Sequence, residues 1–276
     1  MPTYDVLPER ESRWQPSLER WLQIATQAAW AASAEILDVY QRPEYDVSQK
    51  SDASPLTEAD QRAHAVICQT LQSTGLPVLS EEEQRFHPFA ARQDWELFWL
   101  VDPLDGTREF ISRNGEFVVN IALIQGGSPL LGVVCVPVRG LLYGGCQALN
   151  RAWKRELGQP HETPLDPLRQ ASGRTQSIAL ASRSHATPET TAFLARFPGV
   201  SCLARGSALK FLALAEGEAD FYPRFGPTRE WDTAAPQAVL EAVGGSVCTP
   251  EGDPLCYNKP ELQNPHFIAR RPGFSE

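Results

Sequence analysis

The sequence lacks any hydrophobic run close to the ~18 consecutive apolar residues that a membrane-spanning helix needs. Its first sixteen residues are charged and contain no apolar segment, so we expect no signal peptide. The six cysteines form no CxxC pair and no zinc-like spacing. We therefore expect buried free thiols in a reducing compartment, with the cytoplasm as the localisation.

Basic runs are also missing, and the formal net charge is −9. This balance argues against a nucleic-acid polymer or an anionic membrane as the partner. It does not exclude a small phosphorylated ligand, because a bound metal ion can reverse the sign of a local field. An acidic protein that handles phosphate should therefore carry metal ligands.

The 276 residues, 42% of them hydrophobic, suffice for one large domain or two closely packed ones. The first half predicts two long helices followed by mostly antiparallel strands, which is an α+β pattern. After a poorly ordered lead-in over residues 1–16, we expect helices at 17–40 and 57–73, strands at 77–80 and 97–101, and a meander at 116–146.

The second half alternates strands and helices, which is an α/β pattern. The expected strands cover 177–182, 200–204 and 220–225, and the expected helices cover 187–197, 207–217 and 233–243, before a last strand or two. We therefore expect an N-terminal subdomain over 1–165 that carries most metal ligands. A C-terminal subdomain over 166–276 would complete the site.

The stretch VDPLDGT places Asp102 and Asp105 three residues apart, on a bend that contains a proline. Their carboxylates and the carbonyl of Leu104 offer the oxygen ligands that hard divalent cations prefer. Gly106 and Thr107 offer backbone N–H groups to an anion. The competing explanation is that the two aspartates simply cap a turn.

Other acids stand at the ends of expected elements, and each also has a structural explanation. The cluster Glu81–Glu83 follows a strand and could be a solvated face, while Asp60 fits an N-terminal capping pattern with Thr57. Asp232 begins the last long helix, where the helix dipole favours an acid. Together, acids at four separate element ends indicate a multi-metal phosphate site assembled from distant segments.

Several short motifs occur over roughly residues 54–235 in the order in which a known family carries them. They are SPLTEAD, PVLSEE, WLVDPLDGTREFISRNGEFVVNIALI, SRSH, GSALKF, AEGEADFYPRFGPT and WDTAA. Through these motifs the chain resembles the inositol monophosphatase superfamily of magnesium-dependent, lithium-sensitive phosphatases. The basic residue and Glu-Phe after DGT, with RNGEF, resemble its CysQ-type 3'(2'),5'-bisphosphate nucleotidases. The resemblance implies a layered αβαβα sugar-phosphatase fold.

The resemblance also implies roles for individual residues. Two or three Mg²⁺ ions would be bound by Glu81, Asp102, the carbonyl of Leu104, Asp105 and Asp232. Spacing alone does not select among Glu81, Glu82 and Glu83; the family pattern selects the first. Thr107, helped by Asp60, would orient and deprotonate the attacking water.

The remaining implied roles concern the substrate. The N–H groups of Gly106 and Thr107 would hold phosphate oxygens beside the metal ligands, and Ser207 and Lys210 would face the nucleotide and its second phosphate. His185 of SRSH would line the same cleft or lie in a surface loop. One departure is Pro236, where the family commonly has glycine; it removes an early helical N–H and could shift the first turn.

The resemblance thus implies a nucleotidase that removes the 3'-phosphate of adenosine 3',5'-bisphosphate and leaves AMP, in sulfate assimilation. A nucleotide would be its small-molecule partner, and the chain would be a monomer or a homodimer. The alternative enzyme is an inositol or sugar phosphatase of the same fold, against which GSALK and DGTREF argue. A non-catalytic regulator would be expected to lose a ligand acid or the threonine, and all are present.

Overall fold

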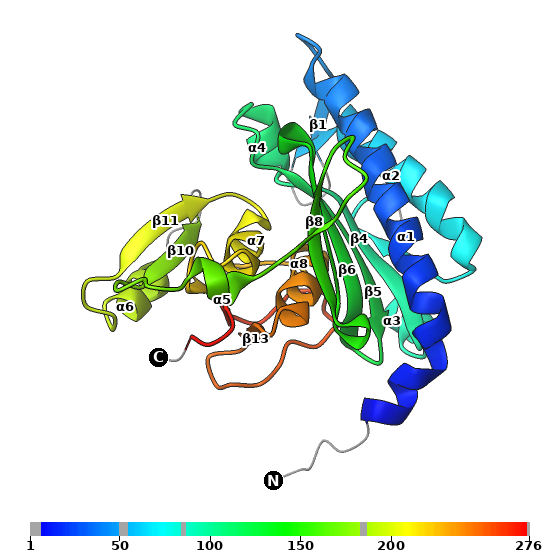
Figure 1. Ribbon diagram of the computed structural model, residues 1–276. Helices are drawn as coiled ribbons and strands as arrows, with labels where there is room; N and C mark the ends of the chain where they lie inside the picture. Colours follow the sequence, from blue (N-terminus) through cyan, green and yellow to red (C-terminus); the bar gives the residue numbers. More distant parts are fainter. Residues whose placement is uncertain (1–6, 50–54, 84–86, 183–186, 275–276) are drawn as a thin grey trace.

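The computed structural model describes residues 7–49, 55–83, 87–182 and 187–274, which form two large sheets and the helices around them (Figure 1). The helices are α1 (Leu7–Tyr40), α2 (Glu58–Leu71), α3 (Phe89–Arg92), α4 (Thr107–Ile111), α5 (Pro167–Gln170), α6 (Pro188–Leu194), α7 (Leu209–Ala215) and α8 (Glu230–Ala242). A small antiparallel pair, β1 (Val47–Gln49) and β2 (Pro55–Thr57), precedes α2.

The first large sheet has seven strands in chain order and is antiparallel except between its first two strands. Its strands are β3 (Val78–Ser80), β4 (Leu97–Asp105), β5 (Val118–Gln125), β6 (Ser128–Val136), β7 (Leu141–Cys146), β8 (Arg151–Glu156) and β9 (Thr163–Pro164). Alternation along these strands sends one set of side chains to each face. The meander expected from the sequence is confirmed.

The second sheet has five strands in the order β11-β10-β12-β14-β13. They are β10 (Ile178–Ser182), β11 (Ser201–Arg205), β12 (Phe221–Arg224), β13 (Ser246–Cys248) and β14 (Phe267–Arg270). The first three are parallel, as the strand–helix alternation predicts, while β14 runs antiparallel to both its neighbours.

Helices and sheets alternate in layers (Figure 1). One core lies between α1, α2 and the first sheet, and a second core lies between the two sheets around α7 and α8. A third, smaller cluster joins the outer face of the second sheet to α6 through Phe193 and Phe221. This is the layered αβαβα architecture that the sequence led us to expect. The division into subdomains at residue 165 stays a prediction, because α8 of the second half covers the first sheet.

The sequence expectations about the N-terminal lead-in and about the burial of the cysteines are wrong. Helix α1 begins at Leu7, within the expected disordered lead-in, and continues through Pro16. Trp14 lies two turns before Trp21 on the same helix face, and their ring centroids are 5.6 Å apart. This contact packs the N-terminal part of α1 against the core. The cysteines are all free thiols, but Cys202 on the edge strand β11 and Cys256 in a loop are exposed rather than buried.

Helix α8 lies directly on the first sheet because two glycines leave room for its backbone. A Cβ atom at Gly132 would overlap the carbonyl oxygen of Ala235, and one at Gly145 would overlap the Cα of Val239. Side chains at either strand position would push the helix away from the sheet. The same close seating fixes the N-terminus of α8.

Among the described residues, no helix has the length and apolarity required to cross a membrane.

The N-terminus of α8 is further held by Glu230, a fully buried carboxylate. Its oxygens accept hydrogen bonds from the backbone N–H of Asn258 (2.7 Å) and of Lys259 (3.0 Å), and from Lys259 Nζ (2.6 Å). Arg92 holds the same loop by donating to the Asn258 side chain (2.7 Å) and to the Lys259 carbonyl (2.7 Å). A charged network therefore anchors the helix that carries Asp232.

Replacing Glu230 by alanine should destabilise the protein, because it leaves two backbone donors of the 258–259 loop unpaired and removes the carboxylate partner of the Lys259 ammonium. We expect the free energy of unfolding to fall by about 2–3 kcal/mol. This is less than the cost of breaking a fully buried ion pair, because Lys259 reaches solvent. This corresponds to a melting temperature lower by roughly 5–10 °C. Glu261→Ala, an exposed acid of the same loop, is the control and should melt like the wild type.

Candidate active site

Three acids from two distant segments meet at one edge of the first sheet. Asp102, Asp105 and Asp232 each offer a carboxylate oxygen, and these oxygens lie within 4.8 Å of one another. The strand β4 was expected to end at residue 101 but continues to Asp105, with a register shift between Asp102 and Asp105. Pro103 cannot donate to the ladder, so a bulge forms there and both carboxylates come to the same site.

The acids are held in place by donors from several elements. The backbone N–H of Leu104 donates to Asp102 (3.0 Å), and the N–H of Arg229 donates to Asp232 (2.9 Å). Asp105 accepts from the N–H of Ala208 (2.9 Å) and from the Ser207 hydroxyl, which lie in the second half of the chain. These bonds fix the geometry of the cluster without neutralising its charge.

The electrostatics of the cluster call for a cation. Burial raises the pKa of Asp105. Burial, followed by the charges of Asp105 and Glu81, raises the pKa of Asp232 well above its ordinary value. Like charges this close are unfavourable unless a cation is shared between them. With the carbonyl of Leu104 beside them in the chain, they are an all-oxygen donor set that fits a hard divalent cation.

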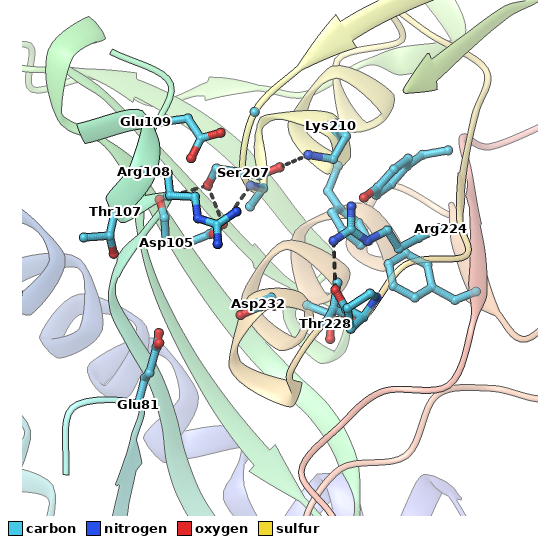
Figure 2. Close-up of a pocket in the computed structure, with 18 residues that line it drawn as sticks. Glu81, Asp105, Thr107, Arg108, Glu109, Ser207, Lys210, Arg224, Thr228 and Asp232 are labelled. Atoms are coloured by element: carbon cyan, nitrogen blue, oxygen red, sulfur yellow. Dashed lines mark hydrogen bonds between the residues drawn. The ribbon is translucent and has the colours of Figure 1, made fainter. Parts of the chain in front are cut away.

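Glu81 lines the same cavity as Asp105 and Asp232, and Figure 2 shows it together with Asp105, Thr107 and Asp232. It directly follows β3, which runs parallel to β4, so the two strands deliver their acids to the same edge. Of the three glutamates at 81–83, Glu81 lines the cavity. Glu83 is instead half-buried, and its burial raises its pKa to about 7.

Asp60 joins a helix cap to the site. One of its carboxylate oxygens accepts from the N–H (2.7 Å) and the hydroxyl (2.5 Å) of Thr57, which caps α2. Its other oxygen accepts from the Thr107 hydroxyl at 3.2 Å. The capping interpretation of Asp60 is confirmed, and its catalytic role stays a prediction. The cap and the contact with Thr107 use different carboxylate oxygens.

Gly106 connects the acid-bearing strand to α4 in a left-handed conformation, with φ of +97°. An added Cβ atom would lie 3.3 Å from the Glu116 carbonyl oxygen and 3.3 Å from the Cα of Phe117. Both the φ angle and the close approach favour glycine. Gly106 and Thr107 line the cavity, where the roles expected for their N–H groups stay predictions.

Ser207 and Lys210 face the same cavity from the loop before α7 and from α7 itself. Ser207 has a left-handed backbone, with φ of +47°, and its hydroxyl donates to Asp105. Lys210 donates to the Ser207 carbonyl (2.5 Å), and burial lowers its pKa to about 8, against the opposing effect of Asp105. Most of the predicted site residues line one cavity of about 260 Å³: Glu81, Asp105, Gly106, Thr107, Ser207, Lys210 and Asp232. Asp60, Asp102 and Leu104 are not among its lining residues.

His185 lies outside the described residues, so the expectation for it remains open. Pro236 is buried within α8, and the helix continues through it to Ala242 while Asp232 stays with the other two acids. The departure from the family pattern therefore leaves the acid cluster assembled.

Sequence reasoning missed two arginines that line the cavity, Arg108 and Arg224. Arg224 stands at the end of β12 and is nine-tenths buried; its Nη2 donates to the Pro227 carbonyl (2.8 Å). Its buried Nε has no hydrogen-bond partner among the described residues. A charged residue ending the apolar strand DFYPRF is the signal that could have indicated it.

Glu116 was also missed, although it lies within the motif RNGEF. Its carboxylate accepts from the N–H of Gly206 at 2.8 Å, which joins the loop after α4 to the loop before α7. A Cβ atom at Gly206 would lie only 3.0 Å from the Glu116 Cβ. Glu116 therefore sets the position of the Ser207 loop against the acid-bearing strand.

Comparison with known proteins places this arrangement in a family. The model of the inositol monophosphatase family matches residues 17–270. The 3'(2'),5'-bisphosphate nucleotidase CysQ of Escherichia coli strain K12 is 44% identical over 245 residues, which are 87% of this chain and 96% of that protein. The protein of the same name from Haemophilus influenzae is 34% identical, over 87% of this chain and 88% of its own length.

Solved structures agree with this assignment. CysQ from Bacteroides thetaiotaomicron, described as a bacterial member of the inositol monophosphatase family, superimposes with a TM-score of 0.80 at 42% identity. The match covers 91% of this chain and 96% of that one. An inositol monophosphatase from Anabaena superimposes with a TM-score of 0.70 at 25% identity, over 92% of this chain and 91% of its own.

Proposed function

Because this chain belongs to the inositol monophosphatase family, we propose that it is a Mg²⁺-dependent 3'(2'),5'-bisphosphate nucleotidase. It hydrolyses the 3'-phosphate of adenosine 3',5'-bisphosphate and releases AMP and phosphate. We place the reaction in the cytoplasm and in sulfate assimilation, with inhibition by Li⁺. The relatives that support this assignment carry the nucleotidase name and match nearly their whole length.

The observation that carries the proposal is that two buried basic side chains, Lys210 and Arg224, share the cavity with the acids of the cluster, in addition to Arg108 beside Asp105. Figure 2 shows Glu81, Asp105 and Asp232 facing Lys210 and Arg224 across one space. An inositol monophosphate presents one phosphate, which the acids could take through metal ions. Lys210 and Arg224 then provide for a second anionic group, and a nucleoside bisphosphate supplies it.

We assign Glu81, Asp102, Asp105 and Asp232, with the Leu104 carbonyl, to hold two or three Mg²⁺ ions. Bound there, the ions would neutralise charge on the ester phosphate and lower the pKa of water. The chain's own contribution is to keep the acids in place through the donors described above. Gly106 and Thr107 direct their N–H groups to the phosphate oxygens.

Thr107 and Asp60 supply the proton path. The Thr107 hydroxyl donates to Asp60, so its oxygen lone pairs remain available to accept a proton from the attacking water. As that water loses its proton to Thr107, the hydroxyl proton moves to Asp60. The Thr57 cap prevents the carboxylate from rotating away. General acid–base assistance of this kind contributes about 10²–10⁴-fold to the rate.

Substrate selection would fall to Lys210 and its neighbours. Lys210→Met should raise the KM for adenosine 3',5'-bisphosphate by about 10–100-fold, the value of one charged hydrogen bond, with little change in kcat. Adenosine 3'-phosphate, which lacks the second phosphate, should be affected far less. An equal loss with both substrates would contradict a role in binding that phosphate. Lys154→Met, on the surface away from the cavity, is the matched control.

The identity of the product tests the proposal directly. Chromatography of the reaction with adenosine 3',5'-bisphosphate should reveal 5'-AMP, because the 3'-ester lies at the acids and the 5'-phosphate lies at Lys210. Formation of adenosine 3'-phosphate would mean that the substrate binds in the opposite orientation. It would assign Lys210 and Arg224 to the 3'-group.

A further inference from the structure

Asn120 is a fully buried amide in the middle of β5. Neither its side-chain oxygen nor its side-chain nitrogen has a hydrogen-bond partner among the described residues. A buried polar group left unsatisfied in this way costs about 1–3 kcal/mol. A leucine of similar size would avoid that cost at an otherwise apolar position, so the amide calls for an explanation.

The position of Asn120 supplies one. In the antiparallel pairing of β4 with β5, Asn120 stands directly opposite Asp102. Directly opposed residues point to the same face of the sheet, with Cβ atoms about 4.5–5.5 Å apart. The carboxylate of Asp102 belongs to the acid cluster on the face that α8 covers. The amide of Asn120 therefore lies beside this carboxylate, one strand further into the sheet.

The chemistry of the pair is complementary. A carboxylate accepts up to about four hydrogen bonds, and a carboxamide nitrogen donates two without adding charge. Asp102 accepts the N–H of Leu104 (3.0 Å) through one oxygen. On its other side, Asn120 is opposed by Val134, which offers no polar side chain. A neutral donor on this flank can orient the carboxylate and leave its charge for a cation.

We infer that Asn120 is a positioning residue for Asp102. Its carboxamide N–H donates to the Asp102 carboxylate when a cation is bound, directly or through one internal water, and fixes the orientation of that carboxylate. The inference rests on the metal role proposed above for Asp102. Partners that orient a metal ligand contribute about 10–100-fold to metal affinity.

The test is a titration of the substrate-free protein with Mg²⁺ alone. Mg²⁺ binding is measured by isothermal titration calorimetry and by the rise in melting temperature. Asn120→Leu should weaken Mg²⁺ binding by about 10–100-fold. Its metal-free form should melt at or above the wild-type temperature, because the unpaired amide is gone. If the leucine variant fails to fold, Asn120→Ser takes its place in the test. Its hydroxyl is polar but too short to reach the Asp102 carboxylate, so Mg²⁺ binding should weaken by a similar factor.

Val134→Ala is the matched control, since Val134 flanks Asn120 on the same face but opposes no acid. It should lower the melting temperature and leave Mg²⁺ affinity unchanged. Unchanged affinity in both Asn120 variants would overturn the inference and leave the proposed function standing. A wild-type protein that binds no Mg²⁺ would overturn the metal centre and the inference together.

Discussion

Asp105→Asn is expected to lower turnover of adenosine 3',5'-bisphosphate by at least ~10³-fold, the equivalent of about 4 kcal/mol in the activation barrier. Asp105 is central to the acid cluster, and it is joined to the second half of the chain through Ser207 and Ala208. The amide oxygen of asparagine can still accept both hydrogen bonds, because they go to a single oxygen of Asp105. It cannot provide the negative charge that a shared cation requires.

The fold should survive this substitution. Because burial raises the pKa of Asp105, the charged form is unfavourable in the metal-free protein, and asparagine removes that cost. We expect a metal-free melting temperature at or above that of the wild type, but a smaller rise on addition of Mg²⁺. Asp94→Asn, an exposed acid far from the cavity, should retain full activity. Near-wild-type turnover in Asp105→Asn would refute the metal role.

Asp60→Asn should reduce kcat by about 10²–10⁴-fold, because the amide cannot take the proton that Thr107 passes on. Its oxygen can still accept the Thr57 N–H, so the cap of α2 is retained. The acid cluster is untouched, and Mg²⁺ affinity should therefore change little. Thr107→Val, which removes the hydroxyl and keeps the shape of the side chain, should produce a loss of similar size.

The double role of Asp60 demands a control for the cap alone. Thr57→Ala removes the hydroxyl that donates to Asp60 but leaves the carboxylate beside Thr107. We expect it to cost about 1 kcal/mol in stability, as the loss of a cap does, with less than about tenfold effect on kcat. If Thr57→Ala and Asp60→Asn lose activity equally, Asp60 acts through the helix cap and the proton path fails.

Much of the fold could be predicted from local signals. The spacing of apolar residues predicted α2. The helix expected over 187–197 begins at Pro188, where Thr187 accepts the Thr190 N–H at 3.1 Å. Such elements depend on neighbours a few residues away, which the sequence displays directly. The bulge in β4 was missed because pairing with β5, rather than the Pro103 bend alone, decides where that strand ends.

The residues of the candidate site likewise fall into those that the sequence indicates and those that only the fold reveals. The acids were found because charged residues at the ends of apolar segments are conspicuous in a sequence. Glu116 was not found, because its importance arises from a contact with Gly206 in the other half of the chain. Arg224 carries the same signal as the acids, a charge at the end of an apolar strand, but only the fold shows that it lines the cavity. Asn120 gives no signal in the sequence either, since only the strand register places it opposite Asp102.

The central claim is best tested by measuring phosphate release from adenosine 3',5'-bisphosphate and from inositol 1-phosphate in parallel. Each reaction is run with Mg²⁺, with EDTA, and with Mg²⁺ plus Li⁺. We predict Mg²⁺-dependent release from the nucleotide, abolished by EDTA and suppressed by Li⁺, and much slower release from inositol 1-phosphate. Faster release from inositol 1-phosphate would contradict the assigned substrate, and no release from either would contradict the assignment as an enzyme.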